Sequence, residues 1–248
     1  MLQVQSLSKS FGGVAAVEDV SFNVTKGAVH SVIGPNGAGK TTLFNLLSGV
    51  YTPSSGRILL DGQDVAGLDP ERLARRGMSR TFQNLQVCMN MSASENVALG
   101  AHLHTRSGLL PALLGMTRSA DRTLHQRTRE LMDEVGVGAY ADAHASQLSF
   151  GVLKRLEIAR ALASRPRLLL LDEPAAGLND TETHEIAELI RRIAASGITV
   201  LLVEHDMKMV MSVSDHILVL DHGRRLAEGT AEQVRSNPEV VAAYLGTE

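Results

Sequence analysis

The chain is poor in aromatic side chains and in cysteine: its 248 residues include no tryptophan, three tyrosines, five phenylalanines and one cysteine. A single cysteine excludes an intramolecular disulfide and argues against a cysteine-based metal site, so we interpret Cys88 as a small buried hydrophobe. No apolar run approaches the ~20 residues that a helix needs to cross a bilayer, and residues 1–6 have the pattern of neither a signal peptide nor an anchor. Any membrane role is therefore expected to come through a partner.

An excess of positive charge is also absent. The 24 lysines and arginines are slightly outnumbered by 27 aspartates and glutamates, which gives a formal net charge of −3. Nucleic-acid-binding domains normally carry a basic excess, so nucleic acid is not expected as a partner. With 44% hydrophobic residues the chain can bury a sizeable core, as one large domain or as one domain with an insertion.

One glycine-rich stretch fits the pattern G-x-x-x-x-G-K-[ST]. It follows the apolar residues 28–33 and precedes leucines at helical spacing. Its residues are Gly34, Pro35, Asn36, Gly37, Ala38, Gly39, Lys40, Thr41 and Thr42. This order of strand, loop and helix predicts a phosphate-binding loop rather than a chance glycine-rich turn.

The residue types of this loop suit that chemistry. Glycines let the backbone turn successive N–H groups toward phosphates, and the following helix adds the positive end of its dipole. Lys40 is expected to neutralise the outer phosphates and the Thr41 hydroxyl to ligate Mg²⁺, with Thr42 backing the loop.

The residues before the loop alternate apolar and polar side chains over 2–7 and 17–24, which predicts two antiparallel strands. Phe11 lies between these strands, beside the turn at Gly12 and Gly13. It is interpreted equally as a core residue or as an aromatic ring that stacks on the adenine of a nucleotide.

Two further apolar runs end in polar residues. The run 168–171 leads into Asp172 and Glu173, whose side chains should point to opposite faces of a strand and so have different jobs. One carboxylate can hold Mg²⁺ through water, and the other can hydrogen-bond the attacking water beside a γ-phosphate. The run 198–203 precedes His205, which at the carboxyl end of a parallel strand can hydrogen-bond a γ-phosphate.

From about residue 84 to residue 164 the hydrophobic period is helical, which predicts a helical insertion in an α/β frame. Ser94 and Ser149 are the expected N-caps, and Ser149 with the N–H of Gly151 offers an anion site or simple capping. A helical hairpin is expected over 102–128, with an apolar patch that packs locally or meets a partner.

The last part of the chain is expected to form a hairpin around residues 221–223. A helical tail from 230 to 246 should follow, broken at Asn237 and Pro238.

These motifs, in this order, resemble the ATP-binding subunit of ABC transporters over essentially the whole chain. The matching positions are Phe11, Gly34 to Thr42, Gln83, Leu148 to Gly151, Leu168 to Pro174 and His205. The resemblance implies an α/β fold with a P-loop NTPase core, made of a RecA-like sheet and an antiparallel β-subdomain, and an inserted helical subdomain. The implied division is a nucleotide-binding core at 1–83 and 165–222, a helical subdomain at 84–164, and a C-terminal strand and helical tail at 223–248.

The resemblance also implies roles for single residues in binding ATP with Mg²⁺. Thr41, Gln83 and Asp172 would lie at the metal, and Gln83 would relay its state to a membrane partner. Glu173 would polarise the attacking water, and His205 would stabilise the γ-phosphate. Ser149 and Gly151 belong to the signature, which in this family caps the γ-phosphate bound by a second copy arranged head to tail.

Within the family, the segments 175–179, 204–211 and 237–246 resemble the branched-chain amino acid importers, and the insertion 102–128 suits the longer of that system's two ATPases. The implied partners are a second ATPase subunit in a homo- or heterodimer, two transmembrane permeases and, indirectly, a substrate-binding protein. The implied location is the cytoplasmic face of the cell membrane.

Two residues depart from the family pattern. Val152 replaces the usual signature glutamine, which bears on the hydrolysis rate more than on the fold, and Asn179 stands where many relatives have aspartate.

Three alternatives stay open: another cargo, which this sequence does not distinguish, and two other classes of protein, which fit less of the sequence. The transporter could carry urea, an amide or a lipopolysaccharide, because the cargo never touches this subunit. A soluble ABC ATPase of translation or DNA repair usually has tandem cassettes or long coiled-coil arms. A P-loop kinase for a small molecule leaves Ser149, Gly151 and His205 unexplained.

Overall fold

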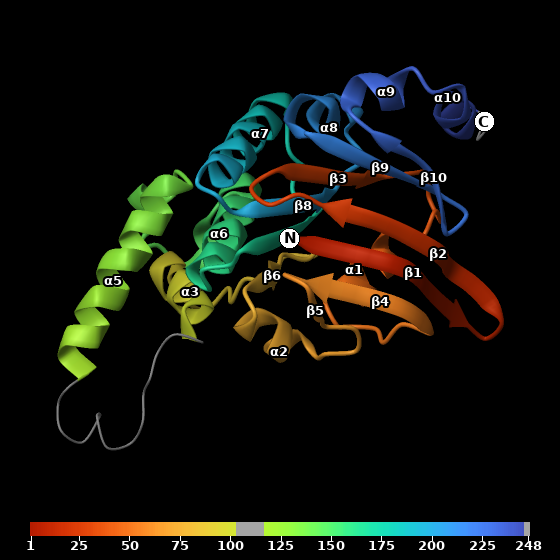
Figure 1. Cartoon of the computed structure of the whole chain (residues 1–248). Coiled ribbons are helices and arrows are strands. Elements are labelled where there is room, and N and C mark those ends of the chain that lie inside the picture. The colour runs from red at the N-terminus through yellow and green to blue at the C-terminus, as the bar shows by residue number, and fades with distance from the viewer. Residues whose placement is uncertain (103–116, 246–248) are drawn as a thin grey trace. The chain divides into compact units, whose positions relative to one another are not determined.

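The computed structural model describes residues 1–102 and 117–245, so the apolar patch expected at 109–116 lies outside the described residues. The chain divides into two compact units, Met1–Arg80 with Arg167–Glu248 and Thr81–Pro166 (Figure 1). The C-terminal hairpin and tail thus belong to the first unit. Each unit is described separately.

The first unit contains a four-stranded antiparallel sheet in the order β2-β1-β4-β5. Its strands are β1 (Leu2–Phe11), β2 (Val14–Val24), β4 (Ser55–Leu60) and β5 (Gln63–Asp64). The predicted pair of strands is confirmed, and both strands extend beyond the predicted bounds. In β1 the side chains of Leu2 and Val4 are buried, as alternation requires, and Leu7 is buried after a register shift between Val4 and Leu7.

The six-stranded sheet of the same unit has the order β10-β9-β3-β8-β7-β6. Its strands are β3 (Val29–Ile33), β6 (Met78–Arg80), β7 (Leu168–Asp172), β8 (Thr199–Val203), β9 (His216–Asp221) and β10 (Arg224–Gly229). Neighbouring strands are parallel except for the antiparallel pair of β9 and β10, which is the predicted hairpin. Every residue of β3, β7 and β8 is buried, which accounts for the high apolar content of these strands, although β3 also buries His30 and Ser31.

Parallel strands need crossover connections, and helices supply them. The helices of this unit are α1 (Lys40–Leu47), α2 (Pro70–Arg75), α7 (Asp180–Ala195), α8 (Met207–Val213), α9 (Ala231–Arg235) and α10 (Pro238–Leu245). The broken helical tail is confirmed as α9 and α10. The short elements α2, β6 and α8 were not predicted from the sequence.

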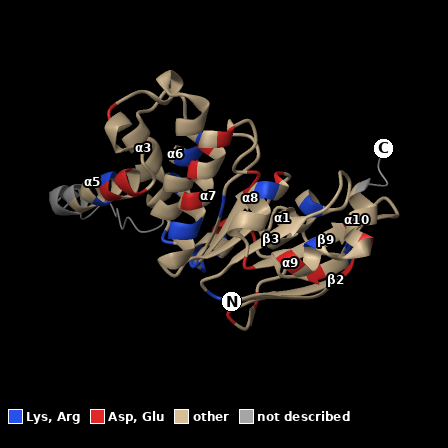
Figure 2. Cartoon of the chain, turned by 90° about the horizontal axis from the view of Figure 1, so that it is seen from above, with Lys and Arg blue, Asp and Glu red and all other residues tan. Residues whose placement is uncertain are grey.

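Helix α7 begins with a capping box in which the Asn179 side chain accepts a hydrogen bond from the Glu182 N–H, and Glu182 accepts one from the Asn179 N–H. Asp180 and Glu182 lie in its first turn and Arg192 in its last, so the charges complement the helix dipole. Figure 2 shows both charge signs on this helix. Asparagine and aspartate cap helices about equally well, so the unusual Asn179 is compatible with the start of α7.

The core of the first unit lies around α1. Leu43 and Phe44 on this helix are fully buried, together with Leu168 and Leu170 of β7 and Val17 of β2, in one hydrophobic cluster. Packing of α1 into this cluster fixes the helix that begins with Lys40.

The second unit is helical, as predicted. Its elements are α3 (Ala93–Gly100), α5 (Thr117–Glu134), α6 (Phe150–Ala163) and two short 3-10 helices, Gly138–Tyr140 and Ala145–Gln147. The predicted N-cap Ser149 is confirmed for α6. The predicted N-cap Ser94 is wrong, because the N-cap of α3 is Ser92, two residues earlier. Ser92 and Glu95 form a capping box that satisfies two backbone N–H groups.

Within the described residues, the search for a membrane-crossing helix finds none that combines sufficient length with sufficient apolar character.

Candidate active site

The glycine-rich loop connects β3 to α1, and its backbone requires glycine at two positions. Gly39 is the N-cap of α1 with a φ of 97°, and a Cβ atom there would lie 2.5 Å from the carbonyl oxygen of Ala16. A Cβ atom on Gly34 would lie 2.1 Å from the carbonyl oxygen of Leu220. Because real Cβ atoms do not approach oxygens so closely, the loop conformation depends on both glycines.

Lys40 is the first residue of α1, and its side chain folds back over the loop. Its Nζ donates hydrogen bonds to the carbonyl oxygens of Gly34 at 2.7 Å and Pro35 at 3.0 Å. Burial lowers the pKa of Lys40, and the negative charge of Glu173 opposes that shift. The ammonium group is therefore held inside the loop, at the N-terminal end of a helix, where an anion is favoured.

The other loop residues lie at the surface or close to it. Asn36, Gly37 and Thr41 are exposed, Ala38 is buried, and Pro35, Gly39 and Thr42 are half-buried. The exposed Thr41 hydroxyl is thus accessible to a ligand.

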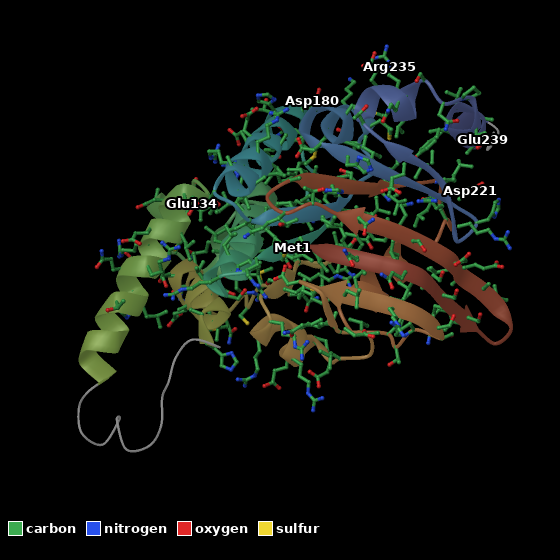
Figure 3. The ribbon with its side chains drawn as sticks, in the orientation of Figure 1. Met1, Glu134, Asp180, Asp221, Arg235 and Glu239 are labelled. Atoms are coloured by element: carbon green, nitrogen blue, oxygen red, sulfur yellow. The ribbon has the colours of Figure 1, made fainter. Side chains whose placement is uncertain are left out.

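The C-terminal helix α10 reaches this loop, which the sequence alone did not indicate. A pocket of about 210 Å³ is lined by residues 35–38, by Asp221 at the end of β9 and His222 after it, and by Ala242 and Ala243 of α10. Figure 3 labels Asp221 and the α10 residue Glu239. The hydroxyl of Tyr244 has a hydrogen bond with the backbone of Gly34. Burial raises the pKa of this hydroxyl to about 12, and the hydrogen bond opposes the shift.

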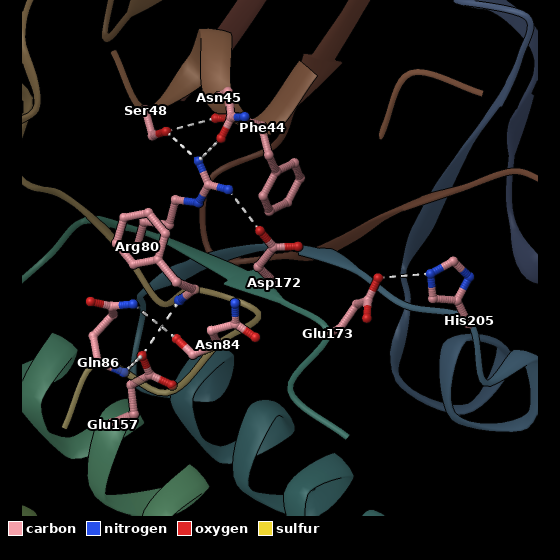
Figure 4. Close-up of polar contacts among 11 residues, drawn as sticks. Phe44, Asn45, Ser48, Arg80, Asn84, Gln86, Glu157, Asp172, Glu173 and His205 are labelled. Carbon is pink, nitrogen blue, oxygen red and sulfur yellow. Dashed lines mark hydrogen bonds and ion pairs between the residues drawn. The ribbon is translucent and has the colours of Figure 1, made fainter. Parts of the chain in front are cut away.

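Asp172 is the last residue of β7 and Glu173 follows it, and the two carboxylates have different partners, as predicted. Oδ2 of Asp172 accepts a hydrogen bond of 2.7 Å from Nη2 of Arg80. Glu173 has a left-handed backbone with a φ of 49°, and its N–H donates to the carbonyl oxygen of Val203. Figure 4 shows Asp172 in contact with Arg80 and Glu173 in contact with His205.

Glu173 and His205 form the clearest catalytic geometry. Nε2 of His205 lies 2.7 Å from Oε1 of Glu173, and the side chains are 47% and 13% exposed, respectively (Figure 4). A carboxylate and an imidazole in hydrogen-bond contact, partly open to solvent, can hold and transfer a proton. A positive φ in a non-glycine residue costs free energy, and such strain is found preferentially at functional sites.

Glu204 is a residue of this site that sequence reasoning did not identify. It is 3% exposed, and its carboxylate accepts backbone hydrogen bonds from Ala175 at 2.7 Å and His205 at 2.9 Å. Burial raises the pKa of Glu204, while the backbone hydrogen bonds act in the opposite direction. The sequence signal for Glu204 was its position next to His205, which was predicted to be catalytic. The backbone groups that Glu204 binds could not be predicted, because the fold brings them together.

The residues present fit Mg²⁺. The Thr41 hydroxyl and the Asp172 carboxylate are oxygen donors, which this ion prefers, and it usually takes one or two carboxylates plus substrate phosphates. Among the described residues, no group of three or more His, Cys, Asp or Glu side chains could hold a metal ion by itself. The donor set therefore fits an ion that arrives with a phosphate substrate.

Phe11 is 44% exposed, so it is not a core residue. Its ring makes an edge-to-face contact with Tyr51, with centroids 5.3 Å apart, and Nζ of Lys9 lies 5.1 Å from its centroid. An exposed aromatic ring is available for stacking, and the role of Phe11 toward adenine stays a prediction.

Three predicted residues lie in the second unit. Ser149 is exposed at the N-terminus of α6, where its hydroxyl accepts a hydrogen bond of 3.4 Å from the N–H of Val152, and Gly151 is buried in the first turn. Gln83 is exposed in the segment before α3. These three residues are not placed relative to the residues of the first unit.

The segment around Gln83 is held by a buried carboxylate that the sequence did not single out. Glu157 of α6 accepts backbone hydrogen bonds from Phe82 at 3.5 Å and Gln86 at 3.3 Å (Figure 4). Arg160, on the same helix, donates to the carbonyl oxygen of Gln86. Burial is the main cause of a raised pKa at Glu157. Helix α6 thus fixes both Ser149 and the backbone on either side of Gln83.

Comparison with known proteins finds two matching family models. The model described as ABC transporter matches residues 17–176, and the model described as Branched-chain amino acid ATP-binding cassette transporter matches residues 224–248.

Two relatives align over the full chain. One is the high-affinity branched-chain amino acid transport ATP-binding protein BraF of Pseudomonas aeruginosa, which is 46% identical, with 99% of this chain and 98% of the relative covered. The other is the protein LivG of Escherichia coli K12, described in the same words, which is 44% identical with the same coverage.

Two solved structures are similar as well. The ADP conformation of MJ1267, an ATP-binding cassette of an ABC transporter, gives a TM-score of 0.86 at 31% identity, covering 99% of this chain and 98% of that one. The dimeric structure of a post-hydrolysis state of the cassette MJ0796, bound to ADP and Pi, gives 0.78 at 25% identity, covering 93% and 99%.

Proposed function

The chain belongs to the ABC transporter family, and we propose that it is the ATP-hydrolysing subunit of an importer for branched-chain amino acids. Two observations support the two halves of this proposal. The contact of 2.7 Å between Glu173 and His205, in the unit that contains the glycine-rich loop, supports hydrolysis. The match of residues 224–248 to a model of branched-chain amino acid transporters supports the cargo.

In the proposed mechanism, the glycine-rich loop binds the triphosphate of ATP. Its backbone N–H groups and the N-terminal end of α1 favour the negative charge, and Lys40 donates to the outer phosphate oxygens in place of its bonds to Gly34 and Pro35. The exposed ring of Phe11 is proposed to stack on the adenine.

Thr41 and Asp172, with Gln83, are proposed to hold Mg²⁺. When bound, the ion neutralises charge on the β- and γ-phosphate oxygens. Side chains of the protein carry out the proton transfer and hold the attacking water and the γ-phosphate.

Glu173 is proposed to accept a proton from the attacking water at Oε1, as a general base. Nε2 of His205 lies in contact with the same oxygen, so the ring orients the carboxylate until the nucleotide binds. With ATP bound, Nε2 would donate to the γ-phosphate instead and leave Oε1 free for the proton of the water. The Glu204 carboxylate accepts a hydrogen bond from the backbone N–H of His205 and so holds His205 in place.

A second ATPase subunit is proposed to complete the site. In a head-to-tail dimer, the exposed Ser149 hydroxyl and the N–H groups at the start of α6 would face the γ-phosphate held by the other subunit. The dimeric state of the similar cassette MJ0796 supports this arrangement. Two permeases and a substrate-binding protein are the further proposed partners, which would place the chain at the cytoplasmic face of the membrane.

The test begins with affinity purification of the tagged chain from detergent-solubilised native membranes. We expect two polytopic permeases and a second ATPase to be recovered with it. The complex, reconstituted in vesicles with its binding protein and ATP on the cassette side, should accumulate radiolabelled leucine, isoleucine and valine.

Two results would contradict the proposal at different levels. Uptake of urea, an amide or a lipopolysaccharide instead of leucine would overturn the cargo and leave the transporter. An ATPase recovered only from the soluble fraction, without a membrane partner, would overturn transport. A complex carrying Glu173→Gln is the matched control, because it should assemble and fail to transport.

A further inference from the structure

Arg80, the last residue of β6, is the centre of a buried polar cluster in the first unit. Its Nη2 donates to Oδ2 of Asp172 at 2.7 Å, and its Nη1 donates to Oδ1 of Asn45 at 2.7 Å and Oγ of Ser48 at 2.6 Å (Figure 4). The side chains of Arg80 and Asp172 are only 6% and 5% exposed. The guanidinium of Arg80, on β6, therefore connects β7 with α1 and with Ser48 at the C-terminal end of α1.

The shape of the side chain matters in this cluster. The guanidinium carbon lies 5.7 Å from the ring centroid of Phe44, which is fully buried on α1. A planar group with two terminal nitrogens can contact a ring with its face and three oxygens with its edge, whereas a lysine ammonium is a point charge. The cluster is thus specific for arginine.

Stability alone does not account for such a pair. Taking two charges out of water offsets most of their mutual attraction, so apolar side chains of similar volume are often equally stabilising. The position of the pair supplies another reason. Asp172 and Thr41 are the two proposed Mg²⁺ ligands of this unit, and they lie on β7 and on α1, the two elements that Arg80 connects.

We propose that Arg80 is a positioning residue for Mg²⁺: it fixes the orientation of the Asp172 carboxylate relative to α1 and thereby sets how strongly the ion strengthens nucleotide binding. This inference rests on the proposed function, since it concerns the same nucleotide site. In this proposal Arg80 affects the ion through Asp172, whereas Lys40 and the loop backbone bind the phosphates.

The test compares the affinity of the full chain for a fluorescent ATP analogue in EDTA with its affinity in the presence of Mg²⁺. In EDTA, Arg80→Met should bind the analogue within about two-fold of wild type, because the loop and Lys40 are unchanged. With Mg²⁺, its dissociation constant and its half-saturating Mg²⁺ concentration should rise about 10-fold, the usual effect of losing a residue that orients a metal ligand.

Arg80→Lys tests the geometry separately from the charge. It keeps the positive charge without the fork, so the Mg²⁺-dependent gain in affinity should fall between those of wild type and Arg80→Met. If Arg80→Met does not fold, the Mg²⁺ dependence of nucleotide binding in Arg80→Lys tests the proposal by itself. Arg75→Met removes the arginine of an exposed pair with Glu71 on α2 and is the matched control, which should behave as wild type.

A double variant tests the route of the effect. In an Asp172→Asn background, Arg80→Met should cause no further change in the Mg²⁺ dependence, because the residue it orients has already lost its charge. Independent effects of the two substitutions would overturn the proposal.

The remaining outcomes are also decisive. Equal weakening of binding in EDTA and in Mg²⁺ would assign Arg80 a purely structural role. Unchanged Mg²⁺ dependence in both Arg80 variants would overturn the inference and leave the proposed function intact. A wild-type chain that binds no nucleotide would overturn the proposed function and this inference with it.

Discussion

The carboxylate of Glu204, just after β8, accepts a hydrogen bond of 2.7 Å from the backbone N–H of Ala175, in the loop after β7. Through its other oxygen it accepts one from the N–H of His205. The two loops that carry Glu173 and His205 are therefore joined by one buried side chain. Their alignment depends on a residue that itself need not touch the substrate.

Replacement of Glu204 by alanine should leave three backbone N–H groups, those of Ala175, His205 and Asp206, without their acceptor. We expect the free energy of unfolding to fall by about 2–3 kcal/mol and kcat for ATP to fall more than KM changes, since Lys40 lies on another loop. Urea denaturation and steady-state ATPase assays measure the two effects. Glu204→Gln keeps one carbonyl acceptor and should recover part of both losses; an alanine variant with normal kcat would contradict the positioning role.

Glu173→Gln should bind ATP and hydrolyse it at least about 100-fold more slowly, because an amide cannot accept the proton of the attacking water. The uncleaved nucleotide should trap the dimer, which size-exclusion chromatography with ATP and Mg²⁺ detects. Glu182→Gln alters a carboxylate of the α7 capping box and controls for the lost charge. Normal turnover in Glu173→Gln would exclude this residue as the base.

Gly39→Ala should abolish nucleotide binding or folding, because its Cβ atom would meet the Ala16 carbonyl oxygen at 2.5 Å on top of a φ of 97°. Gly37→Ala is the matched comparison: its φ is 82°, but no heavy atom lies within 4 Å of the added Cβ. It should cost only the backbone strain, on the order of 1 kcal/mol. Nucleotide affinity and thermal unfolding distinguish the variants, and equal effects would show that strain alone matters.

Tyr244→Phe should loosen α10 from the glycine-rich loop, since it removes the group that bonds the Gly34 backbone. A loss of about 1 kcal/mol in unfolding free energy is expected, with weaker binding of a fluorescent ATP analogue. With a pKa of about 12, Tyr244 stays neutral, so the effect should not vary between pH 7 and 9. Val241→Ala changes an exposed α10 residue and is the control; unchanged nucleotide affinity in Tyr244→Phe would mean that the tail does not influence the loop.

His30 should make the protein sensitive to acid. Burial, followed by the charge of His216, lowers the pKa of His30 from 6.5 to about 4, while Asp215 and Glu228 oppose the shift. The unfolded chain therefore binds a proton that the folded chain does not, so stability is lost as the pH falls from 6.5 toward 4, by up to about 3 kcal/mol.

His30→Gln should flatten this part of the stability curve, measured by urea denaturation at pH 7.5, 6.0 and 5.0. The exposed His222, replaced in the same way, should leave the curve unchanged. Equal slopes in wild type and His30→Gln would contradict the assignment.

Much of this protein is determined by local sequence. The order of strand, glycine-rich loop and helix around Lys40 follows from residues adjacent in the chain. Different partners for Asp172 and Glu173 were expected from strand alternation, but Glu173 lies just past β7 with a left-handed backbone, so the tertiary structure sets the direction of its side chain. The expected P-loop NTPase fold and the resemblance to ABC transporter cassettes are confirmed by the full-length relatives and the similar structures.

The tertiary structure decided the contacts between distant segments. Arg80 and Asp172 are 92 positions apart and Glu204 and Ala175 are 29 apart, and no periodicity connects such residues. The short elements β6 and α8 escaped prediction because burial against neighbouring elements, rather than their own pattern, holds them in place. Sequence thus names the groups that can bind and hydrolyse a nucleotide, whereas the packing of the two sheets and α1 sets which buried charges hold those groups in position.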